Sequence, residues 1–144
     1  YAPRTIQAAG RILDACISHI YHQRMLEVRS LDTAQQIEKY INDNIAWDLS
    51  IEHLCAHFSV SRAELYQIFH TSFNSSVADY IRSKRISMAE QMIRTTAMQI
   101  SEIASNVGFY DYNYFSKVFH RKFGCSPREY RKKLESGSEA ADKK

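Results

Sequence analysis

Two histidines and a cysteine near the middle of the chain have the types and spacing of metal ligands. His53 and His57 are four residues apart, so on a helix they share a face, and Cys55 lies between them. A zinc site needs three or four protein ligands, and no further ligand follows at a recognisable spacing. The pattern therefore favours a partly exposed pair on a supporting helix, and it predicts no metal and no cofactor.

Serine, histidine and aspartate all occur in the chain, but no sequence motif brings them together as a catalytic site. The chain has no nucleophile elbow of the G-x-S-x-G type and no glycine-rich loop that could hold a phosphate group. We therefore expect that the protein is not an enzyme.

A stretch of seventeen residues, GFYDYNYFSKVFHRKFG from Gly108 to Gly124, combines seven aromatic residues with three basic ones. Such a mixture is typical of surfaces that stack on nucleic-acid bases, and also of core helices with a basic outer face. From Asp111 to Lys133 there are seven Lys or Arg against two Asp or Glu, whereas the whole chain has a net charge of +3. This local excess of positive charge predicts a polyanionic partner at this end of the chain.

The composition is that of a globular protein, with 44% hydrophobic and 24% charged residues in a chain of 144. Its three cysteines, Cys16, Cys55 and Cys125, are far apart, which indicates a reducing compartment rather than a disulfide framework. No apolar run approaches the roughly 18 residues that span a bilayer. We therefore expect a cytoplasmic protein with no membrane partner.

Because the chain begins at Tyr1 without methionine, we also expect it to be part of a longer protein.

Helical periodicity runs through almost the whole chain, and no segment alternates as a strand would. A first helix is expected over about 4–29, with apolar positions three and four residues apart: Ile6, Ala9, Leu13, Cys16 and Ile20. This seam is shorter than the three to four heptads of a convincing coiled coil. It is either a dimerisation seam or a face that packs on a domain outside this chain. A second helix is expected to follow, with Asp32 as its N-cap.

Helix caps and stop signals divide the rest of the chain. A short helix is expected after Ser50, a helix capped by Ser61, a long helix over about 77–94, a short helix over 100–106, a helix between Asp111 and Gly124, and a last helix from Pro127 to about Leu134. Residues 135–144 are polar and are predicted to be a disordered tail.

An internal repeat relates two parts of the chain. The residues Leu65, Phe69, His70 and Phe73 recur fifty positions later as Phe115, Phe119, His120 and Phe123. The caps Ser61 and Asp111 keep the same offset, and the preceding short helices match at forty-nine. A repeated short helix, tight turn and capped helix predicts two helix-turn-helix units joined by the long helix. The expected fold class is therefore all-α: two helix-turn-helix subdomains, a long connecting helix and an extra N-terminal helix.

The second helix of each unit has an apolar inner face and a polar outer face. The amides of Gln67 and Asn113 suit adenine, and the ammonium group of Lys117 suits guanine. The candidate DNA-binding residues are Ser61, Arg62, Ala63, Tyr66, Gln67 and His70 in the first unit, and Asp111, Tyr112, Asn113, Ser116, Lys117, His120 and Arg121 in the second. Phe109 and Tyr114 are expected to pack inward, which leaves Tyr110 and Tyr112 as the rings that could touch nucleic acid.

Two groups of basic residues lie outside these helices. Arg82, Lys84 and Arg85 on the long helix are expected to be solvated. For the run from Arg131 to Lys133, two interpretations stay open: a solvated helix end that the helix dipole favours, or a phosphate contact.

Several motifs follow one another in the second half of the chain. They are Ile103-Ala104 before Gly108-Phe109, then Tyr114-Phe115-Ser116-Lys117, then Ser126-Pro127 before Tyr130-Arg131. Together with Leu65 and Phe69 after Ser61, they resemble the DNA-binding domain of the AraC/XylS family of bacterial transcription regulators, over about 33–133. Gln67 stands where that family often has Arg, and Tyr112 where it often has Pro, so these two residues are expected to alter sequence preference more than fold.

The resemblance implies seven helices and two recognition helices, over about 62–73 and 112–123, that enter successive major grooves. It implies a transcription regulator, expected to be an activator, whose partners are a double-stranded DNA operator and RNA polymerase. Residues 1–31 are then a linker or dimerisation helix at the end of a sensor domain, and 32–134 are the DNA-binding domain. A homodimer is expected through the N-terminal helix or that absent domain.

Two alternative functions remain open. One is a helical protein-interaction module, which would bind no DNA even at low salt. The other is a single-strand nucleic-acid binder, which requires exposed aromatic rings.

Overall fold

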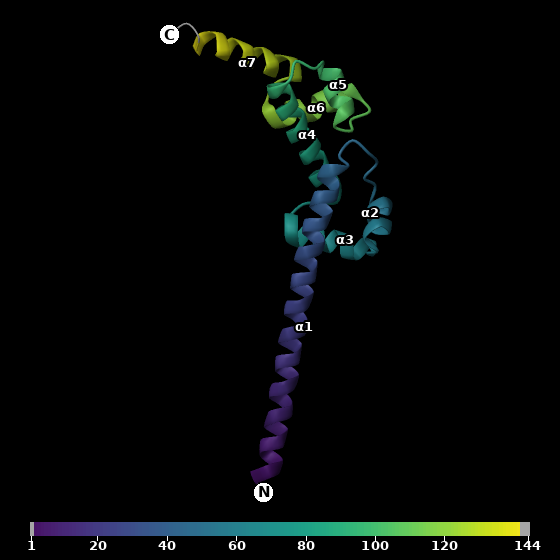
Figure 1. Ribbon diagram of the computed structural model, residues 1–144, viewed down its shortest axis with the longest axis vertical. Coiled ribbons are helices and arrows are strands. Elements are labelled where there is room, and N and C mark those ends of the chain that lie inside the picture. Colours follow the sequence, from purple (N-terminus) through teal and green to yellow (C-terminus); the bar gives the residue numbers. More distant parts are fainter. Residues whose placement is uncertain (1, 142–144) are drawn as a thin grey trace. The chain divides into compact units, whose positions relative to one another are not determined.

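The computed structural model describes the backbone of residues 2–141 and the side chains of residues 13–29 and 31–138. Every regular element in the described backbone is helical (Figure 1). In chain order the elements are α1 (Ala2–Asp43), α2 (Ile51–Phe58), α3 (Arg62–Ile68), the π-helical turn η1 (Phe69–Phe73), α4 (Val77–Thr95), α5 (Ile100–Asn106), α6 (Tyr112–Phe123) and α7 (Pro127–Ala141). The predicted all-α fold is confirmed. The chain divides into two compact parts, Tyr1–Glu38 and Lys39–Lys144, and the second contains both helix-turn-helix units.

The N-terminal helix is longer than the sequence predicted. We expected one helix over about 4–29 and a second one capped by Asp32, but α1 continues without a break from Ala2 to Asp43. Asp32 is not a cap, since its carboxylate accepts a hydrogen bond from the side chain of Gln36 one turn later, at 3.2 Å. The hydroxyl of Thr33 donates back to the carbonyl of Arg29, at 2.8 Å. With no Gly or Pro near Asp32, local helical spacing is satisfied throughout and nothing ends the helix.

The predicted caps of the two helix-turn-helix units are confirmed. Ser61 and Asp111 are both extended, and their side-chain oxygens accept from the first free N–H groups of α3 and α6. The distance is 3.2 Å from the Glu64 nitrogen to the Ser61 oxygen and 2.9 Å from the Asn113 nitrogen to the Asp111 oxygen. Each second helix therefore begins at a fixed residue, which in turn fixes which of its side chains point outward.

Gly108 occupies a turn that only glycine fits. Its φ is +92°, a left-handed conformation that strains other residues. A Cβ built there would lie 2.7 Å from the carbonyl oxygen of Ile45 and 2.8 Å from Nε of Arg85. The turn between α5 and α6 is thus in close contact with α4 and with the segment that precedes α2.

The core of the second unit is formed by α4, α5 and α6. Its buried residues are Ile86, Ala89, Ile93, Ile100, Ile103, Ala104, Val107, Phe109, Phe115, Val118 and Phe119. Phe115 and Phe119 are fully buried, as are Leu65 and Phe69 at the matching positions of the first unit. The aromatic residues of the repeat are therefore mainly core residues, as their spacing predicted.

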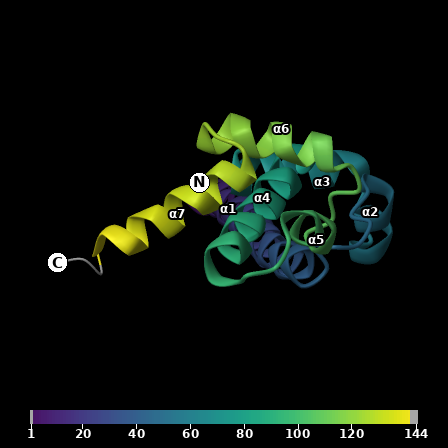
Figure 2. The ribbon, with the colours of Figure 1, turned by 90° about the horizontal axis from the view of Figure 1, so that it is seen from above.

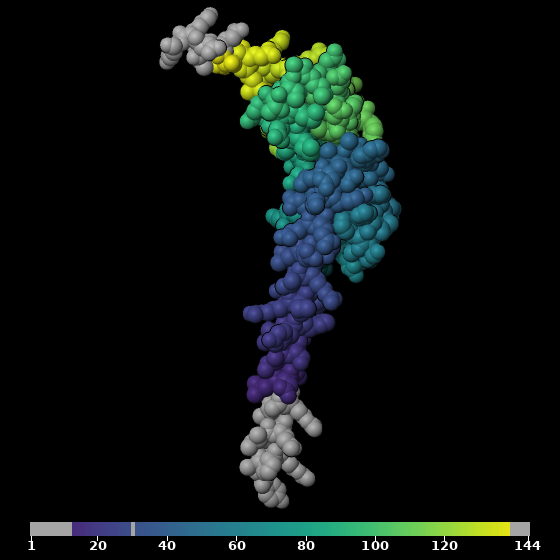
Figure 3. Space-filling model, in the orientation of Figure 1, coloured from purple at the N-terminus to yellow at the C-terminus, as the bar shows by residue number. Residues whose placement is uncertain are grey.

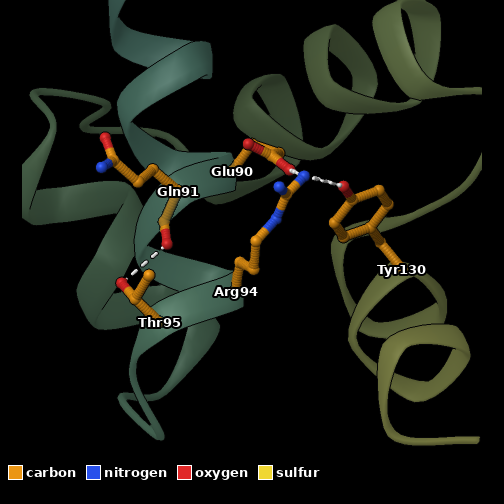
Figure 4. Close-up of polar contacts among 5 residues, drawn as sticks. All are labelled: Glu90, Gln91, Arg94, Thr95 and Tyr130. Carbon is orange, nitrogen blue, oxygen red and sulfur yellow. Dashed lines mark hydrogen bonds and ion pairs between the residues drawn. The ribbon is translucent and has the colours of Figure 1, made fainter. Parts of the chain in front are cut away.

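Polar contacts hold α7 against α4 (Figure 4). The hydroxyl of Tyr130 donates to the carboxylate of Glu90 at 2.5 Å. Arg94 forms an ion pair with the same carboxylate and donates to the oxygen of Tyr130 at 3.3 Å. Together with the ring of Tyr130, which meets Phe119 edge-on at 5.5 Å, these contacts fix the start of α7.

The end of α7 also differs from the prediction. We expected this helix to stop near Leu134, but it continues to Ala141. The segment contains no proline, and the hydroxyl of Ser136 returns to the carbonyl of Lys132 at 2.9 Å within the helix. Residues 142–144 of the predicted tail lie outside the described residues. No helix in the described part of the chain is both long enough and apolar enough to cross a membrane.

Candidate nucleic-acid interface

The outward side of α6 gathers six of the predicted site residues. They line one shallow hollow of about 680 Å³, and we call them the α6 face: Tyr112, Asn113, Ser116, Lys117, His120 and Arg121. Four of the six are exposed, while Tyr112 and Ser116 are half-buried. Alternating steps of one and three residues place all of them on one side of the helix, opposite the buried Phe115 and Phe119.

The rings around the α6 face have different environments. Tyr112 packs partly on the core, with its ring 6.2 Å from that of Phe115. Tyr110 is 89% exposed but lines a different cleft, beside Trp47. Phe109 is buried as predicted, whereas Tyr114 remains 46% exposed. Tyr114 therefore packs beside the core with one part of its ring and leaves the other part in solvent. Its ring lies 6.0 Å from that of Phe109, over the rim of the core.

The outward side of α3 carries the site residues of the first unit. The α3 face consists of Arg62, Ala63, Tyr66 and Gln67 of α3 and of His70 in η1, all of them exposed. Tyr66 and His70 share a hollow of about 400 Å³ with Asn74 and residues that follow it. The cap Ser61 is also exposed, but its oxygen is engaged by the helix, as is that of Asp111.

The two faces differ in charge. Arg62 forms an ion pair with Glu52 of α2, so the guanidinium of the α3 face is already partnered. Among the described side chains, neither Lys117 nor Arg121 of the α6 face pairs with a carboxylate. Lys122, by contrast, turns away and donates to the hydroxyl of Ser87 on α4 at 2.9 Å. The α6 face thus presents two available cations, and the α3 face presents mainly neutral polar groups.

Seen from above, α3 and α6 lie on the same side of α4 (Figure 2). Each follows a short first helix, α2 or α5, and each begins at a capped turn. The structure therefore gathers the predicted residues into two separate groups, on helices that lie on the same side of α4.

Two arginines have structural roles that the sequence did not reveal. Arg85, expected to be solvated, donates from Nε to the carbonyl of Ile45 and from Nη2 to that of Trp47, both at 3.0 Å. Its burial lowers the pKa of the guanidinium from the usual value, partly offset by Tyr110 and Asp48. Arg131 donates to the carbonyl of Met98 at 2.6 Å. Their carbonyl partners lie 33 to 40 residues away, so no local pattern marks them.

The two histidines of α2 pack against a tyrosine. The hydroxyl of Tyr40 and Nε2 of His53 are hydrogen-bonded at 2.7 Å, and the Tyr40 ring stacks 4.0 Å from that of His57. In the described side chains, no group of three His, Cys, Asp or Glu residues could hold a metal ion. These histidines join the end of α1 to α2 and take no part in either face.

Known proteins resemble this chain in sequence. The helix-turn-helix domain family matches residues 54–133. The HTH-type transcriptional activator RhaR of Cronobacter sakazakii is 32% identical over 100 residues, which are 69% of this chain and 35% of that protein. Regulatory protein SoxS of Escherichia coli strain K12 is 34% identical over 104 residues, which are 67% of this chain and 97% of that protein.

A solved structure gives the same result in three dimensions. A transcriptional regulator from Chromobacterium violaceum, described as having an AraC-type DNA-binding domain, superposes with a TM-score of 0.64 at 25% identity. The similarity covers 75% of this chain and 94% of that one. The chain spans about a third of the length of the curated relatives that match first.

Proposed function

The chain belongs to the AraC family of helix-turn-helix transcription regulators, and on that premise we propose that α3 and α6 are its two recognition helices. They bind a specific site on double-stranded DNA. The observation that carries this proposal is the α6 face: polar and basic side chains gather on one exposed side while the phenylalanines of the same helix fill the core.

The α6 face supplies both kinds of contact that DNA recognition needs. Asn113 and Lys117 lie one turn apart near the start of the helix, where a recognition helix meets base edges. An amide pairs with the donor and acceptor of adenine, and an ammonium group with the acceptors of guanine. Arg121, one turn further on, is placed to neutralise a phosphate. We therefore assign base reading to Asn113 and Lys117, and positioning to Arg121.

The α3 face offers a weaker electrostatic attraction. Gln67 has the amide that suits adenine, and Tyr66 and His70 offer contacts to sugars, phosphates or thymine methyls. Arg62 is held in an ion pair with Glu52. Its guanidinium reaches DNA only if this ion pair opens, or if Arg62 and Glu52 together lie at the edge of the protein–DNA contact. We propose that the α3 face contributes more to sequence preference than to overall affinity.

The connecting helix sets the distance between the two faces. α4 has 19 residues, which corresponds to a length of about 28 Å. Successive major grooves on one side of B-DNA are about 34 Å apart. If α4 stays rigid, DNA has to bend toward the domain for both helices to enter their grooves.

We further propose that the protein pairs with a second copy through α1. Five apolar residues fall on one side of this helix and are more than half exposed: Leu13, Ile17, Ile20, Val28 and Leu31. The described side chains of this part of α1 are among the purple atoms of Figure 3. Their spacing is three or four residues except between Ile20 and Val28, where Arg24 interrupts the stripe, and such a stripe suits a parallel two-stranded coiled coil. Ile6 and Ala9 of the predicted seam lie outside the described side chains.

Two matched substitutions test the dimer. Ile20 and Leu26 are 53% and 51% exposed, but Ile20 lies in the stripe whereas Leu26 lies on the far side of α1 from it. Ile20→Lys should convert the dimer to monomer in sedimentation experiments, because it places a charge in the seam, whereas Leu26→Lys should leave the dimer intact. A monomeric parent protein, or equal effects of both substitutions, would reject this seam.

The cellular role follows from the family and is likewise proposed. We propose a cytoplasmic regulator that activates transcription by placing RNA polymerase beside its operator. The single-strand alternative loses support because Phe109, Phe115 and Phe119 are buried and cannot stack on bases. The protein-interaction alternative is supported by the stripe on α1, but as an addition to DNA binding.

Selection of binding sites from random duplexes tests the DNA proposal. We expect two enriched half-sites with centres about one helical turn, 10–10.5 base pairs, apart. The affinity should fall steeply with salt, since released counterions accompany each phosphate contact. A preference for single strands in competition, or no enrichment at low salt, would reject α3 and α6 as recognition helices.

A further inference from the structure

A second cleft lies between the two helix-turn-helix units and is distinct from the hollows of the α3 and α6 faces. It has a volume of about 590 Å³ and is formed by the segment before α2, by α4, and by the turn before α6. We call it the inter-unit cleft. The residues that decide its chemistry are Trp47, Arg82, Arg85, Gly108, Tyr110 and Tyr114. Its size is within the range of pockets that bind small molecules.

Three aromatic side chains line the inter-unit cleft and are exposed to solvent. Trp47 is 71% exposed, Tyr110 89% and Tyr114 46%. None of them belongs to the α6 hollow, so the proposed DNA contact does not use them. Rings of this kind offer flat apolar faces together with N–H and O–H groups at their edges. The cleft is therefore suited to a planar ligand.

The polar groups of the inter-unit cleft favour a ligand with acceptor atoms. Its two carboxylates accept hydrogen bonds from the backbone but keep their negative charge: Asp48 accepts from the Ser50 nitrogen at 3.1 Å and acts on the charge of Arg85, and Asp111 caps α6. Its donors are less engaged. Trp47, Tyr110 and Tyr114 make no side-chain hydrogen bond within the described part of the chain. Arg85 places a half-buried guanidinium in the wall.

We propose that the inter-unit cleft binds a planar aromatic carboxylate. The ring lies against Trp47 and Tyr110, and the carboxylate accepts hydrogen bonds from the phenol and indole donors close to the charge of Arg85. Arg82 is also in the wall, but its guanidinium is paired with Asp79 at 2.7 Å, so it adds positive potential rather than a free donor. Binding at this site does not require the protein to bind DNA.

Occupancy of the cleft bears on both recognition helices. Gly108 packs against the carbonyl of Ile45, so the turn before α6 and the segment before α2 meet at this point. A ligand that contacts both sides fixes their separation, and with it the separation of α3 and α6. On the proposed function, the ligand therefore changes the affinity for paired half-sites, and the reciprocal effect of DNA on ligand affinity has the same size.

The site is tested first without DNA, with 2-naphthoate as the probe. Trp47 is the only tryptophan in the chain, so its indole N–H gives a single resonance that reports directly on the cleft. We expect saturable shifts of this resonance and of the Gly108 and Tyr110 amides. The neutral 2-naphthalenemethanol and the non-aromatic decahydronaphthalene-2-carboxylate should each bind about tenfold more weakly. Equal binding of either control would overturn the proposed ligand class.

A matched pair of variants locates the site. Tyr110→Ala should weaken 2-naphthoate binding about fivefold, because an aromatic wall is removed. Tyr21→Ala, which removes a tyrosine that is 69% exposed on α1, should leave binding unchanged. Shifts that are absent up to the solubility limit, or equal affinity of both variants, would overturn the site itself.

The regulatory consequence has a separate readout. Affinity for the selected duplex, measured with and without saturating 2-naphthoate, should change at least about threefold in the parent protein and not in Tyr110→Ala. If DNA affinity is unchanged when 2-naphthoate saturates the cleft, the coupling between ligand and DNA binding is rejected, but the ligand site is not. Loss of all DNA binding with a saturable cleft instead rejects the proposed function.

Discussion

The two helix-turn-helix units have the same frame but different local conformations. The caps Ser61 and Asp111 keep the same offset as the later pair Ser76 and Ser126, so the segments between them are equally long in both units. In the first unit, however, α3 ends in the π-helical turn η1, whereas α6 stays α-helical to its last residue. The repeat therefore fixes where each helix begins and ends, and the conformation between those points is free to diverge.

The units also differ at their left-handed positions. The first unit uses Ser59 and Asn74, with φ of +53° and +48°, where the second uses Gly108 and Gly124. Residues other than glycine are strained in this conformation, although Asn tolerates it better than most. The first unit therefore carries backbone strain that the second avoids, and its outward face carries less available positive charge. We therefore expect the second unit to be the more stable of the two.

The largest expected effect comes from the matched core phenylalanines. Phe119→Ala and Phe69→Ala should each lower the free energy of unfolding by about 3–5 kcal/mol, because both rings are fully buried. Chemical denaturation followed by circular dichroism measures both values. A fully stable Phe119→Ala protein would contradict its place in the core. If only the first-unit variant gives two separate transitions, the units unfold independently.

Gly108→Ala should have the next largest effect. We expect a loss of about 2–4 kcal/mol, since alanine adds left-handed strain and a Cβ that meets the Ile45 carbonyl. Ser59→Gly, at the matching position of the first unit, should instead stabilise by about 0.5–1 kcal/mol. Thermal unfolding of the two variants shows whether backbone strain at this turn causes the difference in stability between the units. A harmless Gly108→Ala would show that the turn can open enough to accept a Cβ beside the Ile45 carbonyl.

The local signals in the sequence were sufficient to predict the two helix-turn-helix units of the domain. The capping residues Ser61 and Asp111 and the apolar spacing of Phe115 and Phe119 are short-range features, and they predicted helix starts and the inner face correctly. The same spacing separated the six residues of the α6 face from the core. Local chemistry, repeated at a fixed offset, therefore determines most of this fold.

Long-range contacts and equal spacings account for what the sequence did not reveal. Arg85 bonds to carbonyls about 40 residues away, so its role depends on the completed fold. The apolar residues Leu65, Phe69 and Phe73 are four apart, as are their counterparts in α6, so the pattern gives no sign of η1. At Asp32, a good capping residue stands inside a helix because no neighbouring residue interrupts α1.

The difference in charge between the faces predicts a difference in DNA binding. Lys117→Ala and Asn113→Ala should each weaken specific DNA binding by about 1–3 kcal/mol, and Gln67→Ala should weaken it by less. Fluorescence anisotropy with the selected duplex at several salt concentrations measures both affinity and salt slope. Arg121→Ala should reduce the salt slope by about one, since the cation assigned to a phosphate is lost.

An exposed lysine outside both faces provides the control. Lys39→Ala, on α1, should leave specific affinity unchanged. All of these variants should keep the thermal stability of the parent protein, because the substituted side chains are exposed. If Gln67→Ala weakens specific DNA binding more than Lys117→Ala does, the α6 face is not the main source of DNA affinity.

The smallest expected effect is at Gly124, the residue that ends α6. Its φ is +76° and a Cβ added there would meet no atom within 4 Å, so a substitution adds backbone strain without a clash. Gly124→Ala should therefore cost about 1 kcal/mol, and Gly124→Asn about half of that. Asn74 already holds the matching position in the first unit, which is why asparagine should be the milder change. Equal costs in denaturant unfolding would mean that Asn74 is tolerated because of η1 rather than because of its own side chain.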